Sequence, residues 1–285
     1  MKTLREAVQE ALVGKRAIGH FNISDSNQLR AIALAAKAVS LPVIIGLSEG
    51  ERDYFPLAHA RALIDLYRAD GIDMFLNADH TYSLEKVQAA IAAGVDSVIY
   101  DGAKSGIEEN IVVTTSVVEA ARASGRDVIV EAELGYIGQS SKVLTELPPG
   151  AALTPEMMTS VADAKRFIDS TGVDCFAPAV GNVHGMLGIS QDPPLNIERV
   201  QEISTTTKTP LVLHGASGNS EVDITAAIAA GVAIVHINTE LRVTYRDGLR
   251  EGIAGDEVAP YKFLAPAGKR MQAFIEEKLR LFAGK

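Results

Sequence analysis

Residues 72–102 read IDMFLNADHTYSLEKVQAAIAAGVDSVIYDG, and they set the pattern that the rest of the chain repeats. The stretch opens with an apolar run that predicts a buried strand ending in His80, and it closes with a second such run that ends near Asp101. The segment between the two runs has helical spacing, with Ser83 in the N-cap position and Gly94 as a stop signal. A strand, a helix and a strand in this order predict two parallel strands of one sheet.

The same alternation of strand and helix runs through the whole chain. The other predicted strands are RAIGHFN (16–22), LPVIIGLS (41–48), DVIVEAELG (127–135), VDCFAPAV (173–180), TPLVLHG (209–215) and VAIVHINT (232–239). Segments with helical pattern follow them at 29–39, 55–70 and 107–125, and a further helix is predicted to open at Thr154-Pro155. Eight such units favour an α/β fold in which the parallel sheet closes into a (β/α)₈ or TIM barrel. Such a barrel commonly takes about 250 residues, so residues 1–285 are predicted to form one domain.

Composition excludes several classes of protein. Hydrophobic residues make up 47% of the chain and charged residues 22%, which is enough apolar material for a core. No apolar run reaches the roughly 20 residues that cross a bilayer, and MKTLREAVQEALVGK (1–15) is an amphipathic helix rather than a signal peptide. A net charge of −9 without a basic cluster argues against a nucleic-acid partner. The single cysteine, Cys175, predicts a buried structural thiol and a cytoplasmic protein.

Imidazole and carboxylate residues follow five of the apolar runs. They are His80, Asp101, Glu133, His184 and His214. Because the active site of a barrel forms at the carboxyl ends of its strands, these side chains are expected to converge. Three neutral imidazoles with one open position form the ligand set of a catalytic zinc ion, although another divalent metal also suits such residues.

Other acidic and histidine residues near these strand ends have more than one possible role. Asp79 directly precedes His80, so the two side chains are predicted to point in different directions. Asp79 would then be free to act as an acid/base near the metal. Its alternative role is to stabilise the start of the next helix. Asp101 and Glu133 either hold a ligand histidine, pair with buried cations, or form an alternative metal position. A lone histidine is usually structural or solvated, which is the preferred reading of His20 and of His59.

Glycine-rich and polar segments after the last two strands predict a phosphate site. HGASGNS (214–220) offers free backbone N–H groups and the hydroxyl of Ser217, and HINTE (236–240) adds Asn238 and Thr239. Phosphate sites after strands 7 and 8 are common in barrels.

Together these motifs resemble the class II, metal-dependent ketose-bisphosphate aldolases, a family that includes fructose- and tagatose-bisphosphate aldolases. The resemblance spans the chain and rests on FN (21–22), PVIIGLSEG (42–50), ADH (78–80), YDGAK (100–104), VEAELGYIG (130–138), GNVHG (181–185), LVLHGASG (211–218) and INTEL (237–241). It implies reversible cleavage of a ketose 1,6-bisphosphate, with fructose 1,6-bisphosphate preferred, to dihydroxyacetone phosphate and glyceraldehyde 3-phosphate. It also implies a monovalent cation, Na⁺ or K⁺, near the phosphate, and a homodimer or homotetramer.

The resemblance assigns roles to individual residues. His80, His184 and His214 match the zinc ligands, Asp79 matches the catalytic acid/base, and Asp101 and Glu133 match an alternative metal position. The matching substrate-binding positions are Gly185, Gly215, Ala216, Ser217, His236, Ile237, Asn238 and Thr239, to which we add the strand-end residues Asn22 and Ser48.

This chain departs from the family pattern at three points. The loop after ELG reads GQSSKVLTE (138–146), with Ser140 and Ser141 where the family has acids that move a substrate-carbon proton; Glu146 or His236 are the candidate replacements. The usual lysine–x–asparagine before the terminal NTE block is replaced by Ile234 and His236, and the residue after DG is Ala103.

Alternatives therefore stay open at the sequence level. They are an aldolase for tagatose 1,6-bisphosphate or another keto-sugar phosphate, and a metal- and phosphosugar-binding relative without turnover. For the second phosphate, Lys269 and Arg270 are the basic candidates, either serving a neighbouring subunit or lying on a solvated helix face.

Overall fold

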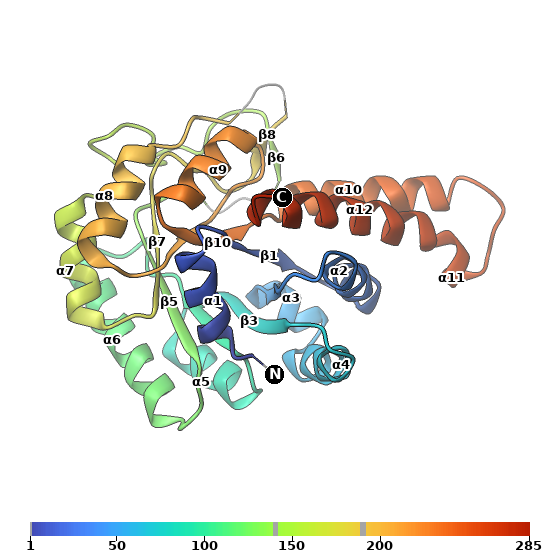
Figure 1. Ribbon diagram of the computed structural model, residues 1–285, viewed down its shortest axis with the longest axis horizontal. Coiled ribbons are helices and arrows are strands. Elements are labelled where there is room, and N and C mark those ends of the chain that lie inside the picture. The colour runs from blue at the N-terminus through green and yellow to red at the C-terminus, as the bar shows by residue number, and fades with distance from the viewer. Residues whose placement is uncertain (1, 139–141, 189–191) are drawn as a thin grey trace.

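The computed structural model describes residues 2–138, 142–188 and 192–285, and in this part of the chain eight parallel strands close into a barrel (Figure 1). Around the barrel the strand order is β1-β10-β9-β7-β5-β4-β3-β2. The strands are β1 (Ile18–Asn22), β2 (Val43–Leu47), β3 (Met74–Thr81), β4 (Ser97–Tyr100), β5 (Ile129–Leu134), β7 (Cys175–Pro178), β9 (Leu211–Leu213) and β10 (Val232–His236). Each lies within one of the eight predicted runs, or extends one of them by a residue, so the predicted (β/α)₈ fold is confirmed.

Helices surround the barrel and connect its strands. They are α2 (Ser26–Val39), α3 (Glu49–Tyr54), α4 (Leu57–Ala69), α5 (Leu84–Ala92), α6 (Ile107–Ala123), α7 (Val161–Thr171), α8 (Ile197–Thr207) and α9 (Glu221–Ala230). The local signals hold at α5, where the hydroxyl of Ser83 accepts the N–H of Lys86 and Gly94 follows the helix with φ +91°.

The prediction of a helix opening at Thr154-Pro155 is wrong. Helix α7 begins at Val161, because the hydroxyl of Ser160 accepts the N–H of Asp163 and forms the true N-cap. Upstream, the hydroxyl of Thr159 donates to the carbonyl of Leu134 in β5, which ties this part of the chain to the barrel in a non-helical conformation.

Helix α1 (Leu4–Val13) closes the amino-terminal end of the barrel. Its buried residues Leu4, Ala7 and Val8 form one apolar cluster with inward-facing strand residues such as Phe75 and Cys175. Functional groups are therefore confined to the opposite, carboxyl end of the strands, where a short sheet of β6 (Val143–Leu144) and β8 (Met186–Leu187) also lies.

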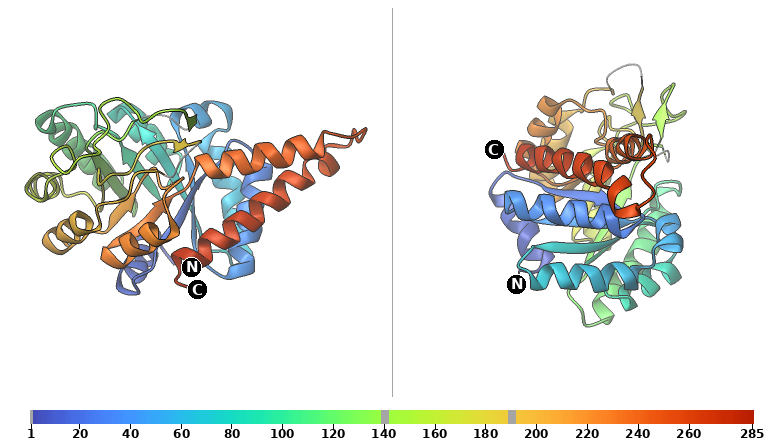
Figure 2. Two further views of the ribbon diagram at one scale, coloured as in Figure 1. Left: turned by 90° about the horizontal axis from the view of Figure 1, so that it is seen from above. Right: turned by 90° about the vertical axis from the view of Figure 1, so that its right-hand side faces the viewer.

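Two C-terminal helices form an arm that the sequence patterns did not predict. Helices α10 (Thr239–Gly252) and α12 (Ala265–Phe282) pack against each other and project away from the barrel, joined at the far end by α11 (Pro260–Phe263) (Figure 2). Near the barrel α12 packs on α2, but Ile253, Val258 and Tyr261 are exposed at the far end. Across the described ranges no helix combines the length and hydropathy of a membrane span.

Candidate active site

A cavity of about 250 Å³ opens at the carboxyl ends of the strands and gathers most of the predicted site residues. Its lining comprises Asn22, Ser48, Glu49, Gly50, Asp79, His80, Tyr82, Asp101, His184, Gly185, Gly215, Ser217, His236, Asn238, Thr239 and Arg242. Glu133 and His214 lie buried directly behind this lining, in contact with His80.

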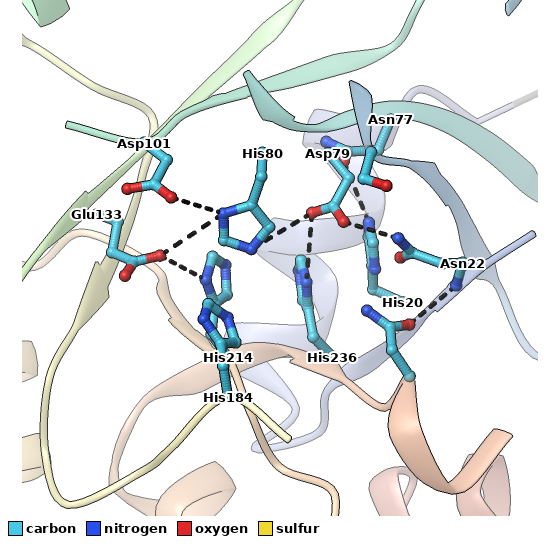
Figure 3. Close-up of polar contacts among 12 residues, drawn as sticks. His20, Asn22, Asn77, Asp79, His80, Asp101, Glu133, His184, His214 and His236 are labelled. Atoms are coloured by element: carbon cyan, nitrogen blue, oxygen red, sulfur yellow. Dashed lines mark hydrogen bonds and ion pairs between the residues drawn. The ribbon is translucent and has the colours of Figure 1, made fainter. Parts of the chain in front are cut away.

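An irregularity in β3 brings two consecutive side chains into the site. The pairing of β3 with β4 shifts between Ala78 and Thr81, so that one extra residue of β3 is accommodated there. As a result Oδ1 of Asp79 and Nε2 of His80 lie 3.9 Å apart, and the predicted divergence of these side chains is wrong (Figure 3). A regular strand would have sent one of them to the outside of the barrel.

Four side chains form a cluster suited to a metal ion. One ligand atom each from His80, Glu133, His184 and His214 lies within 4.8 Å of the other three. Imidazole nitrogens with one carboxylate oxygen are ligands that zinc prefers. Asp101 lies beside this cluster, with Oδ2 3.0 Å from Nδ1 of His80.

Hydrogen bonds fix which nitrogen of two histidines is free. Nδ1 of His184 lies 2.7 Å from the carbonyl of Gly138, which can only accept, so Nδ1 carries the proton and Nε2 is left for a metal. In the same way the carboxylate of Asp101 accepts from Nδ1 of His80. In both rings Nδ1 thus donates a hydrogen bond to a group outside the four-residue cluster, and this bond fixes the orientation of the ring.

His214 is clamped between two buried glutamates. Oε1 of Glu131 lies 2.7 Å from its Nε2, and Oε2 of Glu133 lies 2.9 Å from its Nδ1. Burial alone would lower the pKa of His214, but the hydrogen bonds to Glu131 and Glu133 outweigh it and hold the pKa well above its usual value. Glu131 was not among the predicted site residues; its position two residues before Glu133 on one strand, and therefore on the same face, was the available signal.

The other two cluster histidines titrate in opposite directions. Burial lowers the pKa of His80, yet the charge of Asp79 and the hydrogen bond to Asp101 raise it to about 9. Burial together with the nearby positive charge of His80 lowers the pKa of His184 to about 4. A metal ion entering the cluster must therefore displace protons from some ligands but not from others.

Asp79 is a buried carboxylate with one free oxygen. Its Oδ2 accepts a hydrogen bond of 2.7 Å from Nδ2 of Asn22, whereas its Oδ1 has no hydrogen-bond partner in the described structure. Burial raises the pKa of Asp79, but the positive charges of His80 and His20 and the hydrogen bond from Asn22 together outweigh it and leave this pKa well below its ordinary value. An ionised, unpartnered oxygen beside the cluster is suited to accept a proton.

The predicted phosphate side of the cavity is built from backbone and small side chains. Asn238 is the N-cap of helix α10 and Thr239 its first residue, so the positive end of this helix dipole faces the cavity. Gly215 has φ +59°, and a Cβ there would lie 2.1 Å from the carbonyl of Val183, so this turn requires glycine. Ser217, whose hydroxyl accepts from the N–H of Glu240, completes this side.

Two predicted substrate residues do not reach the cavity. Ala216 and Ile237 are fully buried, and their N–H groups already donate to the carbonyls of His236 and His20. These N–H groups therefore join strand ends to each other, and the substrate-binding role of Ala216 and Ile237 stays a prediction. The other eight predicted positions, from Asn22 to Thr239, line the cavity.

The cavity lining includes a basic residue, Arg242, that was not among the predicted site residues. Arg242 is the sole lysine or arginine among the described lining residues, and it pairs with Glu51 at 2.6 Å. Lys269 and Arg270 lie on the arm, and Arg270 pairs there with Glu251. Arg242 sits one helical turn after Thr239, a spacing that could have revealed it.

The remaining candidates divide between core and surface. His59 is exposed on α4 and Cys175 is a buried free thiol, as predicted. His20 is buried and does not line the cavity. Of the candidates for proton transfer, Glu146 is exposed and outside the cavity lining, whereas Ser140 and Ser141 lie outside the described residues.

The fold and the site define a class of protein, an α/β-barrel enzyme with an imidazole–carboxylate cluster at the carboxyl ends of its strands. The model of the class II fructose-bisphosphate aldolase family matches residues 2–285, and the chain belongs to this metal-dependent family of carbon–carbon lyases.

Individual relatives agree along almost the full length. The chain is 34% identical over 289 residues to the fructose-bisphosphate aldolase of Geobacillus stearothermophilus. The aligned region covers 98% of this chain and 96% of that protein. It is 32% identical over 287 residues to the fructose-bisphosphate aldolase of Staphylococcus epidermidis, with the same coverage. The crystal structure of the YdjI aldolase from Escherichia coli K12 superposes with a TM-score of 0.84 at 28% identity, covering 98% of this chain and 96% of that one.

Proposed function

We propose that this chain catalyses the reversible aldol cleavage of fructose 1,6-bisphosphate to dihydroxyacetone phosphate and glyceraldehyde 3-phosphate, with zinc as its metal. The observation that carries the proposal is the free Oδ1 of Asp79, which lies 3.9 Å from His80 of the metal-ligand cluster. An acid/base placed beside a metal site is what a retro-aldol reaction needs, because that reaction removes a hydroxyl proton and leaves negative charge behind.

The donor set fits zinc. His80, His184 and His214 would hold the metal, with Glu133 or Asp101 as carboxylate partners in an alternative position. When bound there, zinc supplies a Lewis acid that stabilises the negative charge of the enediolate. Glu131, Asp101 and the carbonyl of Gly138 orient the imidazoles from outside the cluster.

Asp79 performs the proton transfer at the C4 hydroxyl. In cleavage its Oδ1 accepts the hydroxyl proton, the C3–C4 bond breaks, and the bonding electrons remain on the dihydroxyacetone phosphate fragment as an enediolate. In condensation Asp79 returns the same proton to the oxygen of the aldehyde. Asn22 holds Oδ2, so the free oxygen keeps its orientation throughout. No lysine Schiff base is required.

The two phosphates of the substrate are assigned to different kinds of groups, the first to a helix N-terminus with small residues and the second to an arginine. The phosphate of dihydroxyacetone phosphate binds at the start of α10 with the loop from Gly215 to Ser217, where a helix dipole and small residues favour an anion. Arg242 is assigned to the second phosphate because no other described lysine or arginine lines the cavity. We add a monovalent cation, Na⁺ or K⁺, beside the first phosphate on the strength of the family resemblance.

We further propose one domain over residues 1–285, a homodimer or homotetramer, and a cytoplasmic location. The exposed Ile253, Val258 and Tyr261 at the end of the arm support association, since apolar side chains on a projecting hairpin suit a protein partner. The free thiol of Cys175 supports a reducing compartment.

The test is release of glyceraldehyde 3-phosphate from a panel of ketose phosphates by the metal-free and the zinc-loaded protein. Fructose 1,6-bisphosphate should be cleaved fastest, and only after zinc is added. Faster cleavage of tagatose 1,6-bisphosphate would overturn the substrate assignment, and full activity in the metal-free protein would overturn the metal dependence.

A further inference from the structure

Two buried histidines stack face to face at the bottom of the cavity. The rings of His20 and His236 lie 3.6 Å apart between centroids with an angle of 3° between their planes. They are paired residues of the neighbouring parallel strands β1 and β10, and His236 is the last residue of β10. Both side chains are almost completely buried, but His236 lines the cavity and His20 does not.

The surroundings of His20 fix the plane of this stack. Its Nε2 lies 3.1 Å from Oδ1 of Asn77, whose own amide donates to the hydroxyl of Ser97. On the neighbouring strand β2, Gly46 leaves the space that the ring fills, because a Cβ at this position would come within 2.2 Å of Cε1 of His20. The ring is therefore confined by a hydrogen bond, by backbone and by its partner His236.

His236 faces the free oxygen of Asp79. Its Nδ1 lies 4.0 Å from Oδ1 of Asp79, too far for a direct hydrogen bond and close enough for one oxygen atom to bond both. Two hydrogen bonds of about 2.8 Å that meet at one oxygen, at roughly a right angle or somewhat more, span about this distance. The other ring nitrogen, Nε2, is buried and has no hydrogen-bond partner in the described structure, so Nδ1 is the nitrogen placed to bond a ligand beside Asp79.

We propose that Nδ1–H of His236 donates a hydrogen bond to the C4 oxygen of the substrate, the same oxygen whose proton Asp79 accepts, and that His20 is the positioning residue that fixes the plane of His236. This proposal rests on the proposed aldolase function. It makes His236 a catalytic residue of the step that breaks and forms the carbon–carbon bond.

The electron and proton balance of the step is simple. In condensation the C3–C4 bond forms, the π electrons of the aldehyde move onto its oxygen, and that oxygen takes the proton held by Asp79. His236 keeps its own proton and stabilises the charge that develops on the oxygen, as a fixed donor does in an oxyanion hole. Proton exchange at the hydroxymethyl carbon of dihydroxyacetone phosphate involves no aldehyde, so this donor does not act in it.

The test compares two reactions of the zinc-loaded protein. One is cleavage of fructose 1,6-bisphosphate, and the other is exchange of tritium from the hydroxymethyl carbon of dihydroxyacetone phosphate with no aldehyde present. His236→Ala should lower kcat for cleavage about 10²-fold, the usual effect of removing one such donor, and should lower the ratio of cleavage to exchange at least about 10-fold. His236→Asn should recover most of the cleavage, because its amide N–H stands close to the place of Nδ1.

Variants of His20 test the positioning role with the same pair of assays. His20→Phe keeps a flat ring for stacking and should retain the wild-type ratio of cleavage to exchange. His20→Ala removes the ring and should lower this ratio about 10-fold, whereas a merely structural role would lower both rates together. Zinc content, measured for every variant, confirms that the metal cluster is intact.

Each remaining outcome counts against one hypothesis. Parallel loss of cleavage and exchange in His236→Ala, or an Asn variant no better than Ala, would overturn the role given to His236. Equal ratios in the two His20 variants would overturn its positioning role. A wild-type protein that is inactive in both assays would instead contradict the proposed aldolase function on which the inference rests.

Discussion

Replacement of Glu131 tests the metal assignment most directly. Its Oε1 lies 2.7 Å from Nε2 of His214, and both residues are less than 5% exposed, so the contact is sheltered from water. If a metal binds Nδ1 of His214, Nε2 must carry the proton, and Glu131 is the acceptor that keeps it there. The perturbation of choice is Glu131→Gln, with Glu131→Ala as the more severe variant.

The expected loss of zinc affinity in the two Glu131 variants follows from this contact. Removing an outer partner of a ligand histidine typically weakens metal binding by about 10- to 100-fold, or about 1.4–2.7 kcal/mol. The glutamine side chain can turn its amide N–H toward Nε2, which would favour the tautomer that blocks Nδ1, so its effect should lie inside this range. The alanine variant leaves a buried N–H of His214 without an acceptor and should lie at or beyond the upper end.

The assay is zinc affinity, measured by competition with a chromophoric chelator at pH 8, and it needs no catalytic activity. Asp174→Asn is the matched control, because Asp174 is another mostly buried carboxylate but pairs with Arg5 and Arg122 near α1, away from the cavity. Its zinc affinity should equal that of the wild type. Wild-type affinity in both Glu131 variants would refute the clamp on His214 as a determinant of metal binding.

Further predictions concern the cluster, the acid/base and the cavity mouth. Alanine at His80, His184 or His214 should abolish zinc binding and activity together; elemental analysis that finds full zinc in two of these variants would contradict the ligand assignment. Asp79→Ala should keep its zinc and lose cleavage by roughly 10²–10⁴-fold, and a rate within a factor of two of wild type would exclude it as the acid/base. Because the pKa values of His80, about 9, and of His214 are raised in the metal-free protein, their protons are bound at neutral pH and compete with zinc. Zinc affinity should therefore rise with pH up to about 9. Titration calorimetry in buffers of different ionisation enthalpy should show that zinc binding releases protons, and a zinc-binding enthalpy at pH 7 that does not depend on the buffer would disprove this proton competition. Arg242→Ala should raise KM about 10-fold for fructose 1,6-bisphosphate and much less for fructose 1-phosphate, and equal effects on both sugars would remove Arg242 from the second phosphate site.

The barrel was predictable because its signals are local and repeated. Each strand is an apolar run, and each polar residue that follows such a run falls at the same end of a parallel barrel. This argument placed His80, Asp101 and His214 beside one another although 134 positions separate the first and last of them. It required no knowledge of how the strands are ordered.

Other features depend on contacts that spacing does not reveal. The bulge that turns Asp79 and His80 toward one cavity is a pairing shift between two strands, and neither strand shows it alone. Glu131 was read as part of a buried strand, since its role exists only through His214, which lies 83 positions away. The arm was not predicted because the packing of α10 on α12 is what keeps them together outside the barrel.

The placement of carboxylates divides the buried histidines into two functional groups. His80 and His214 each contact two carboxylates or more, so they hold protons until a metal displaces them, and their nitrogens have strong outer partners. In the described structure neither His184 nor His236 has a carboxylate hydrogen-bond partner, and burial together with neighbouring histidines lowers the pKa of both rings, which favours the neutral form. A neutral ring serves either as a ligand that needs no deprotonation, as proposed for His184, or as a fixed hydrogen-bond donor, as proposed for His236. One residue type thus supplies both the metal site and the donor beside Asp79, and the carboxylates, which come from different strands, decide which role each ring takes.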